Sequence, residues 1–363
     1  MPVDGDAADK AARYFPPPES EGGWRWLADP GRVLDHAGVE LGPLELEFRR
    51  QQLLYGGDSW GIVVVRHGWL AAECSTFNVA STSCFDLWSC TKSFTSLAWG
   101  MLLHSGAPDV AVTLDTPAYD LIPEGWPLTD PRKERITVGH LLSMTSGIAG
   151  ESRGIYGMPT SADGGVFEFA LGRAANRFGA DVGRLIHDPG SAWDYSDPAY
   201  CHLSLAFTHV TKQTMAQYLR ERVFEKIGVE QALWEYQGGR GFLGPVTNAH
   251  TGMHMSARDL ARVGYLIAND GFWAGEAVVP TDWIHQATRP SQPCNRAYGF
   301  GWWSNADDRY LPGLPRDMVA MSGYRSNRCY VIPSLDLVVA RVGGGPTGWD
   351  EPQLLRAVVG SCR

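Results

Sequence analysis

The sequence predicts an α/β protein whose layer of strands is built from both ends of the chain, with a helical segment inserted between them. β-Runs rich in apolar residues occur at residues 61–73 and return between residues 298 and 342, as expected for strands of a sheet. Between these runs, residues 107–246 hold helical patches separated by Gly/Pro loops, and β-runs are scarce. We therefore expect one α/β layer that the helical segment interrupts.

These changes along the chain give the expected domain boundaries. Residues 1–22 form an N-terminal leader, which is rich in Pro, Asp and Glu and is expected to be loose. An α/β domain combines residues 23–106 with residues 247–363, and residues 107–246 form a helical insertion domain. With 363 residues, 44% of them apolar, the chain is long enough to bury a large core.

Composition excludes several classes of function. A formal charge of −9 argues against a nucleic-acid partner, which needs a basic surface. No apolar run approaches the length of a membrane span, so no membrane partner is expected. The first 14 residues lack the basic start and apolar stretch of a secretory signal, and the seven cysteines are scattered. We therefore expect reduced thiols and a cytoplasmic location.

The first α/β elements follow from local pattern. Residues 61–66 and 69–73 are two β-runs joined by His67 and Gly68, which predicts a hairpin. Residues 88–103 carry apolar side chains at a period of 3.6 and predict a buried helix, with Ser89 near its N-terminus.

The later elements follow in the same way. Ser256 and Asp259 have the spacing of a capping box and open an amphipathic helix that ends near residue 267. Within the insertion, helices are expected at residues 138–144, 199–211 and 214–227. After it, strands are expected at residues 298–304, 317–321, 328–332 and 337–342, and a closing helix at residues 351–359.

Ser89-Cys90-Thr91-Lys92 is the first candidate for chemistry. Three residues apart on a helix, the serine and lysine side chains share one face, with Cβ atoms about 5–6 Å apart. Burial disfavours an ammonium, and the resulting amine can accept a seryl proton. The alternative is a helix cap followed by an exposed lysine. Since Lys92 lies inside an apolar helix rather than on a charged face, the nucleophile interpretation is favoured.

Two further segments carry candidate residues. Tyr195 precedes Ser196 and Asp197 at a helix start, and a tyrosine beside an ammonium has its phenolate favoured and can act as a general base; alone it is a packed aromatic residue. Ser322 and Gly323 follow a β-run and precede Tyr324, and such a segment can direct an N–H group at an oxyanion; alone it is a turn.

Taken in order, these segments resemble the serine β-lactamase and penicillin-binding-protein superfamily. The resemblance also includes residues 140–147, 256–262 and 331–338, and covers residues 22–342. It is strongest to the class-C-like branch of carboxylesterases and 6-aminohexanoate-dimer hydrolases. The resemblance implies a β-lactamase/transpeptidase-like fold of the α+β type: an antiparallel sheet flanked by helices, an all-α insertion, and a site between them.

Carried over to this chain, the resemblance implies a role for each motif residue. Ser89 would be the nucleophile, Lys92 its activating partner, and Tyr195 the proton carrier between nucleophile and leaving group. The backbone N–H groups of Ser89 and Tyr324 would form the oxyanion hole.

The chain departs from the family pattern at two places. A Tyr-x-Asn triplet is replaced here by a triplet ending in Asp197, which places a carboxylate where an amide often contacts substrate. The Lys-Thr-Gly of β-lactamases becomes Met321-Ser322-Gly323, and Met321 supplies no cation for a β-lactam carboxylate. Arg325 and Arg328 follow closely, and either one could replace this charge or remain a solvated surface residue.

The remaining expectations concern binding residues and absences. Substrate contacts are expected from Asp197, Ser322, Gly323, Arg325 and Trp193. Trp193, Trp302 and Trp303 are candidates for an apolar acyl pocket, and packing in the core is the alternative role for each. His250 and His254 are four residues apart, but the intervening glycine favours a loop over a metal site. His104 and His140 are expected to be core or cap residues. No cofactor is expected, because nucleotide-binding loops are absent from the sequence.

The sequence thus predicts a serine hydrolase that cleaves a carboxylic ester or small amide through a Ser89 acyl-enzyme, with a small molecule as its partner. An acyltransferase using the same site is one alternative. A β-lactamase or D,D-peptidase is a second, and a catalytically silent relative that binds a ligand is a third. The oligomeric state is left open.

Overall fold

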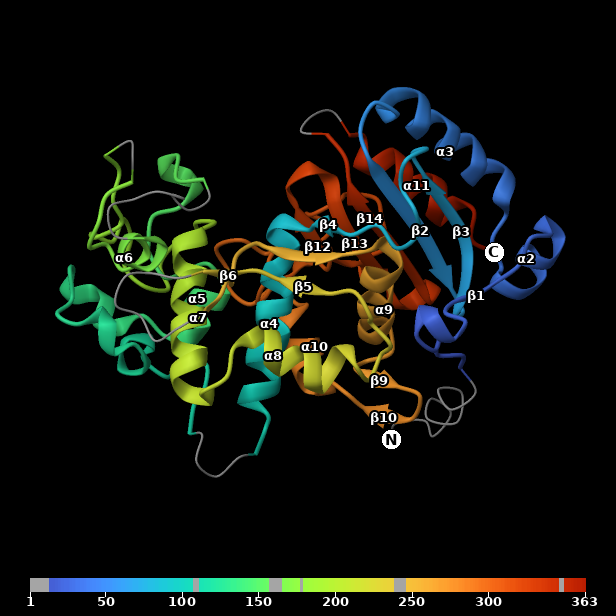
Figure 1. Cartoon of the computed structure of the whole chain (residues 1–363). Helices are drawn as coiled ribbons and strands as arrows, with labels where there is room; N and C mark the ends of the chain where they lie inside the picture. The colour runs from blue at the N-terminus through green and yellow to red at the C-terminus, as the bar shows by residue number, and fades with distance from the viewer. Residues whose placement is uncertain (1–12, 107–110, 157–164, 177–178, 238–245, 346–348) are drawn as a thin grey trace.

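The computed structural model describes residues 13–106, 111–156, 165–176, 179–237, 246–345 and 349–363. Its main feature is a seven-stranded sheet in the order β1-β3-β2-β14-β13-β12-β11 (Figure 1). All neighbouring strands are antiparallel except β1 and β3. The predicted antiparallel sheet built from both ends of the chain is therefore confirmed. Its strands are β1 (Arg25–Trp26), β2 (Trp60–Arg66), β3 (Trp69–Ser75), β11 (Trp303–Ser304), β12 (Val319–Gly323), β13 (Asn327–Ile332) and β14 (Leu337–Gly343).

The predicted hairpin is the pair β2 and β3. His67 and Gly68 connect the strands with φ values of 52° and 71°, the left-handed conformation that tight hairpin turns require. On its other side β2 pairs with β14, from Trp60 opposite Gly343 to Arg66 opposite Leu337. This pairing joins the N-terminal and C-terminal parts of the chain in the middle of the sheet.

Helices cover both faces of the sheet. Because side chains alternate along a strand, Ile62 and Val64 of β2 belong to one core cluster and Val63 and Val65 to the other. The first cluster packs beneath α2 (Pro30–Ala37), α3 (Leu41–Tyr55) and α11 (Glu351–Gly360). The second packs against α4 (Thr91–Leu103), α9 (Ala257–Ala268) and α10 (Thr281–Ala287). The helices α2 and α3 are not among the elements expected from periodicity.

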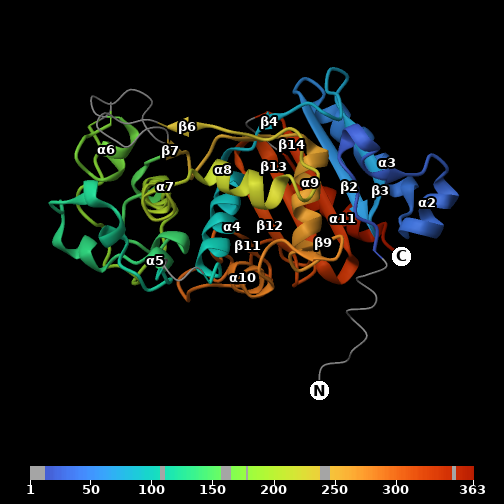
Figure 2. The same cartoon turned by 60° about the horizontal axis from the view of Figure 1, so that its bottom comes forward.

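The segment predicted as an insertion lies on the far side of α4. In both views α4 runs between the sheet and the helices α5, α6 and α7 (Figures 1 and 2). These helices, with the following one, are α5 (Val138–Leu142), α6 (Val166–Ala170), α7 (Asp197–Thr211) and α8 (Met215–Leu219). A π-helical turn, Arg220–Phe224, follows α8 where a continuous helix is expected from the sequence.

Short strands lie outside the main sheet, and those between residues 233 and 255 return the chain to the α/β layer. They form a three-stranded sheet in the order β4-β8-β5 and two two-stranded sheets, β6 with β7 and β9 with β10. Their bounds are β4 (Phe85–Asp86), β5 (Leu233–Trp234), β6 (Tyr236–Gln237), β7 (Val246–Thr247), β8 (Met253–Met255), β9 (Phe272–Trp273) and β10 (Glu276–Ala277). The described residues of the segment predicted as an insertion are thus helical as far as residue 224, and short strands follow from residue 233.

The strand expected at residues 298–304 is shorter than predicted, because glycines turn the chain there. Gly301 has a φ of 79°, and a Cβ on Gly299 would lie 2.0 Å from the Ala287 carbonyl oxygen. The chain therefore makes a close turn against α10, and only Trp303–Ser304 remains as β11.

The leader is not loose where the structure describes it. Residues 1–12 lie outside the described residues, but from residue 13 onward the leader is anchored by the fully buried Arg262 of α9. Its guanidinium donates to the carbonyl oxygens of Pro16 and Pro17 at 2.9 and 2.6 Å, and pairs with Glu19 at 2.9 Å. The expectation of a loose segment is wrong for residues 13–22, because composition does not show this buried partner.

The described residues include no helix that is both long and apolar enough to span a bilayer. All seven cysteines are free thiols, as predicted. Ser256 caps α9 by accepting from the Asp259 amide at 3.1 Å, and the Asp259 carboxylate accepts from the serine hydroxyl at 3.0 Å. The predicted start of this helix is therefore confirmed.

The contact between α4 and α10 requires a glycine. A Cβ on Gly100 would lie 1.9 Å from a ring carbon of the buried Trp283. We expect Gly100→Ala to lower the free energy of unfolding by about 1–3 kcal/mol through overpacking, measured by urea denaturation. The matched control is Gly42→Ala in α3, where nothing lies within 4 Å; it should stabilise the protein by about 0.5 kcal/mol. Equal effects at the two positions would contradict this account.

Candidate active site

Ser89 lies on a short 3-10 turn, Trp88–Cys90, that leads directly into α4. Trp88 has a φ of 51°, and its amide donates to the Asp86 carboxylate at 2.9 Å. This turn places the half-buried Ser89 one helical turn before Lys92, and Lys92 Nζ lies 3.0 Å from Ser89 Oγ. The two side chains are therefore neighbours on one helix face, as the spacing predicts.

Three segments of the chain meet at the Lys92 ammonium. Besides Ser89, Nζ contacts the carbonyl oxygen of His250 at 3.0 Å and Asp197 Oδ1 at 2.6 Å. The lysine side chain is 1% exposed and the aspartate side chain 14%. Thr95, one turn further along α4, donates to the Ala249 carbonyl at 2.8 Å and fixes the bend between β7 and β8 that carries His250. A buried charge is tolerated when it is paired and hydrogen-bonded in this way.

Tyr195 is held beside this cluster by the loop that follows α5. A Cβ on Gly150 would lie 2.0 Å from the Tyr195 carbonyl oxygen, and this carbonyl accepts from the Glu151 amide at 2.9 Å. The adjacent Asp194 accepts from the amides of Gly150 and Ser152 at 2.8 and 3.0 Å. The motif at residues 140–147 thus leads into the loop that positions the tyrosine.

The environment of Tyr195 differs from the one that the sequence predicts. Its hydroxyl group shares a side-chain hydrogen bond with Ser89, and Lys92 Nζ lies 4.7 Å from the centre of its ring. Burial and the Asp197 carboxylate nevertheless raise the pKa of Tyr195 well above 10. The expectation that the lysine favours a resting phenolate is wrong, because burial disfavours the phenolate and the Asp197 carboxylate disfavours it further.

Gly323 brings the end of β12 against the turn that carries Ser89. A Cβ at this position would lie 2.1 Å from the Leu87 carbonyl oxygen and 3.1 Å from the Cys90 amide nitrogen. No larger residue fits without separating the strand from the turn. As a result the backbone of Tyr324, the next residue, is held close to the turn that bears Ser89.

Buried polar side chains fix the turn after Tyr324. Arg325 and Ser326 both have positive φ values, 58° and 62°, which are unfavourable for residues with a Cβ. Asn327 donates to the Tyr324 carbonyl at 2.6 Å, and the buried Arg341 donates to the Ser326 carbonyl at 2.9 Å. These hydrogen bonds hold the Tyr324 backbone in one conformation.

The two arginines near this turn differ in their surroundings. Arg328 makes a two-pronged ion pair with Glu351, with N–O distances of 3.1 and 3.2 Å, and its side chain is 16% exposed. Arg325 is exposed and lines a surface hollow with Asp58, Asp86 and Trp88. Of the two, Arg325 has the accessible guanidinium.

Aromatic rings continue from Tyr195 towards the edge of the sheet. The half-buried Trp193 packs against Tyr298 with 5.7 Å between ring centres, Tyr298 against Trp303 at 5.2 Å, and Trp303 stacks on Tyr310 at 5.1 Å. Tyr310 in turn shares a hydrogen bond with the side chain of Ser322. Trp302, also suggested by the sequence, is fully buried in the core.

The structure therefore brings Ser89, Lys92, Tyr195 and Asp197 into direct contact. It places Trp193, Ser322, Gly323 and Tyr324 around them, with Arg325 on an outer turn. Sequence reasoning missed the His250 carbonyl, Asp194, Asn327, Arg341 and Glu351. Only Asp194 carries a local signal, since it is adjacent to Tyr195 in the motif; the others act through contacts between distant segments.

The histidine side chains considered as metal ligands or cap residues have other contacts. Within the described ranges, no three His, Cys, Asp or Glu side chains gather as metal ligands would. Instead His250 contacts Cys201 at 3.6 Å and His254 pairs with Glu235 at 2.8 Å. His140 accepts from the Thr137 amide at 3.2 Å and is the cap residue that the sequence predicts.

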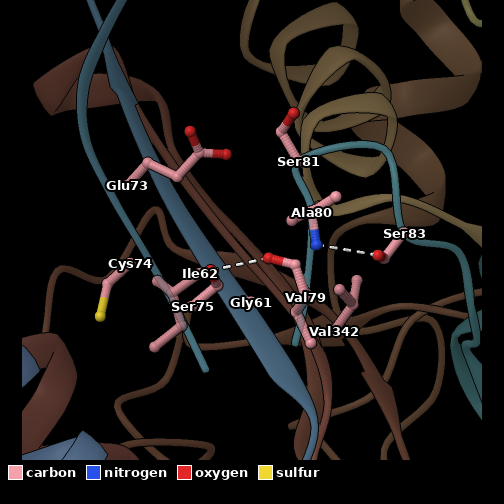
Figure 3. A pocket seen from close by; sticks show the side chains of 11 residues that line it. Gly61, Ile62, Glu73, Cys74, Ser75, Val79, Ala80, Ser81, Ser83 and Val342 are labelled. Atoms are coloured by element: carbon pink, nitrogen blue, oxygen red, sulfur yellow. Dashed lines mark hydrogen bonds between the residues drawn. The ribbon is translucent and has the colours of Figure 1, made fainter. Parts of the chain in front are cut away.

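A cavity of about 230 Å³ lies beside β2 and β3 and the loop at residues 79–83 (Figure 3). Glu73, Cys74 and Ser75 are among the residues around it. Ser89, Lys92 and Tyr195 do not line this cavity. It is therefore separate from the Ser89 cluster.

Known proteins resemble this chain in sequence and in fold. A family model described as Beta-lactamase matches residues 58–358. Penicillin-binding protein 4 of Amycolatopsis lactamdurans is 30% identical over 156 residues, which is 43% of this chain. The matched region spans only 37% of that relative's length.

Solved structures share the fold at lower sequence identity. A putative 6-aminohexanoate-dimer hydrolase from Bacillus anthracis aligns with a TM-score of 0.64 and 19% identity, over 85% of this chain and 79% of that one. EstCE1, a hydrolase with promiscuous acyltransferase activity, aligns with a TM-score of 0.64 and 16% identity, over 88% and 99%.

Because His250 is buried, we expect the free energy of unfolding to decrease as the pH becomes acidic. Burial lowers the pKa of His250 from 6.5 to about 4. The folded protein keeps the ring neutral while the unfolded chain takes up a proton, so stability is present above about pH 6.5 and is lost as the pH falls towards 4. This group contributes a slope of up to about 1.4 kcal/mol per pH unit. Urea unfolding of the wild type and His250→Gln between pH 4.5 and 6.5 should show a shallower slope in the variant; equal slopes would contradict this assignment.

Proposed function

Because the chain belongs to the beta-lactamase family, we propose that it is a serine hydrolase that cleaves a carboxylic ester or small amide through an acyl-enzyme on Ser89. The observation that carries this proposal is the contact of Ser89 Oγ with Lys92 Nζ at 3.0 Å, with Tyr195 hydrogen-bonded to the same serine. A nucleophile in reach of a base, and a base held by a third group, is the arrangement that covalent catalysis needs.

Acylation follows from these contacts. The amine form of Lys92 takes the hydroxyl proton of Ser89 as Oγ forms a bond to the substrate carbonyl carbon. The bond from that carbon to the alcohol or amine then breaks, and the leaving group takes one proton. Tyr195 is a neutral phenol in this environment, since its pKa is raised by burial and by Asp197. It therefore acts as the proton carrier, giving its proton to the leaving group and regaining one from Lys92.

Charge that develops on the carbonyl oxygen needs donors aimed at it. The backbone N–H groups of Ser89 and Tyr324 are the proposed oxyanion hole, supported by the close approach at Gly323 and by the hydrogen bonds of Asn327 and Arg341. Donors held rigidly in this way stabilise a transition state without reorganising. Water then attacks the acyl carbon, the acid is released, and Ser89 regains its proton.

The surroundings support an apolar acyl group. The half-buried rings of Trp193, Trp303 and Tyr310 lie beside the serine cluster, and such surfaces favour apolar ligands. Met321 is fully buried in β12 and supplies no cation, so a β-lactam carboxylate has no counterpart at that position. Small apolar esters are the first substrate class, and short linear amides are the second.

A second candidate function is acyl transfer to an alcohol or amine through the same acyl-enzyme. The likeness of this fold to EstCE1, named for promiscuous acyltransferase activity, favours this alternative. A silent binding protein is disfavoured because Ser89, Lys92 and Tyr195 lie together in contact. The seven free thiols support the cytoplasmic location that the sequence predicts.

Hydrolysis of p-nitrophenyl butyrate tests the proposal. The wild type should turn over this ester, and Ser89→Ala should abolish turnover because the acyl-enzyme cannot form. Lys92→Ala should lower kcat/KM by roughly 10²–10⁴-fold through loss of the base, and Tyr195→Phe should lose most turnover. Equal rates for the wild type and Ser89→Ala would overturn the proposal. Product analysis with and without an added alcohol separates hydrolysis from acyl transfer.

Substitution of Gly323 tests the oxyanion hole, because it displaces the backbone N–H of Tyr324 and removes no side chain. We expect Gly323→Ala to lower kcat by roughly 10²–10³-fold, because a Cβ 2.1 Å from the Leu87 carbonyl pushes the Tyr324 backbone away from Ser89. Gly360→Ala at the end of α11 is the control, since nothing lies within 4 Å of its Cβ. Unchanged kcat in Gly323→Ala, with circular dichroism unchanged, would count against the Tyr324 N–H.

A further inference from the structure

The ion pair of Lys92 and Asp197 is the closest charged contact of the Ser89 cluster. Nζ and Oδ1 are 2.6 Å apart, and both side chains are largely buried. Asp197 is the first residue of α7, after the cap residue Ser196, and the N-terminus of a helix favours a negative charge. The carboxylate is therefore stabilised from two sides, by the helix and by the lysine.

The contacts around Lys92 fit its ammonium form. Nζ donates to the His250 carbonyl and to Ser89 Oγ at 3.0 Å each, and its charge pairs with Asp197 Oδ1 at 2.6 Å. Loss of one proton removes the charge that pairs with Asp197. The ion pair thus favours the ammonium, which has no lone pair with which to accept the Ser89 proton.

We propose that Asp197 is a positioning residue that holds the proton on Lys92 and so sets the lowest pH at which Ser89 becomes nucleophilic. In this scheme Lys92 first releases one proton to water. Its lone pair then accepts the Ser89 hydroxyl proton as the bond from Oγ to the acyl carbon forms. The inference rests on the proposed function and assigns to Asp197 a role other than contact with substrate.

Other ionisable groups face the pair but do not replace Asp197. Glu151 is a second negative group, and its charge interacts with both Asp197 and Lys92. His250 stays neutral because burial lowers its pKa to about 4, and Tyr195 stays neutral because burial and Asp197 raise its pKa. The remaining groups are the buried Cys90, Tyr200, Cys201 and Tyr298.

Two measurements on Asp197→Asn test the inference. The chain has only five lysines, so NMR of protein labelled at the lysine side chains gives few signals, and the Lys92 signal is the one missing in Lys92→Arg. Without the carboxylate, the pH at which this signal changes from ammonium to amine should fall by about one to three units. The acidic limb of kcat/KM for p-nitrophenyl butyrate should move to lower pH by the same amount. On this limb, a shift of one pH unit raises kcat/KM tenfold at a given pH, when kcat/KM is expressed relative to the plateau value of the same enzyme.

Glu151→Gln is the matched control, because it removes a nearby negative charge that does not contact Lys92. It should move both readouts by much less than Asp197→Asn. If Asp197→Asn lowers kcat/KM equally at every pH and the Lys92 titration does not move, Asp197 is only structural and the inference is overturned. If the wild type shows no Ser89-dependent hydrolysis, the proposed function fails, while the Lys92 titration still decides whether Asp197 holds the proton.

Discussion

The structure around the site depends on one buried ammonium group. Lys92 lies in the first turn of α4, and its Nζ is bound by the segment before β8 and by the first residue of α7. These three segments are far apart in the sequence, and each also carries or supports another part of the site. A buried charge with its partner removed costs several kcal/mol, so the segments are held in place around the lysine. The polar residues of α4 extend this effect, since Ser93 and Thr95 also donate to loop carbonyls.

What could be predicted from the sequence is mostly what lies within one helix or one hairpin. The three-residue spacing of Ser89 and Lys92 places both on one face of α4, and His67-Gly68 marks the hairpin turn. The order of the motifs also places Tyr195 and Tyr324 near the serine. The His250 carbonyl could not be found in this way, because any residue can supply a carbonyl and the contact spans 158 positions. The anchoring of residues 13–22 by Arg262 could not be predicted for the same reason, since its partners include backbone carbonyls far away in the sequence.

Charge states were the least predictable property, because they depend on partners that sequence does not pair. The sequence shows Arg325 and Arg328 as equivalent candidates for binding a substrate carboxylate. In the structure, Glu351 of α11 already forms an ion pair with Arg328. Likewise, a lysine beside Tyr195 predicts a phenolate, but burial and the Asp197 carboxylate, 2.6 Å from that lysine, raise the pKa of the tyrosine. In both cases the surroundings of the group decide whether it is available, and these surroundings come only from the fold.

Asp197 shows why stability and reactivity compete at this site. An unpaired ammonium at the position of Lys92 would be destabilising, because desolvation penalises charge. A carboxylate beside it removes that penalty and lets the three segments pack closely. In the proposed mechanism the same carboxylate delays formation of the amine of Lys92, since the proton that pairs with Asp197 must leave before Ser89 can be activated. An amide at this position would reverse both effects. A carboxylate at position 197 therefore stabilises the packing of the three segments, and it reduces the fraction of Lys92 present as the amine at low pH. Proteins often show this exchange of activity for stability.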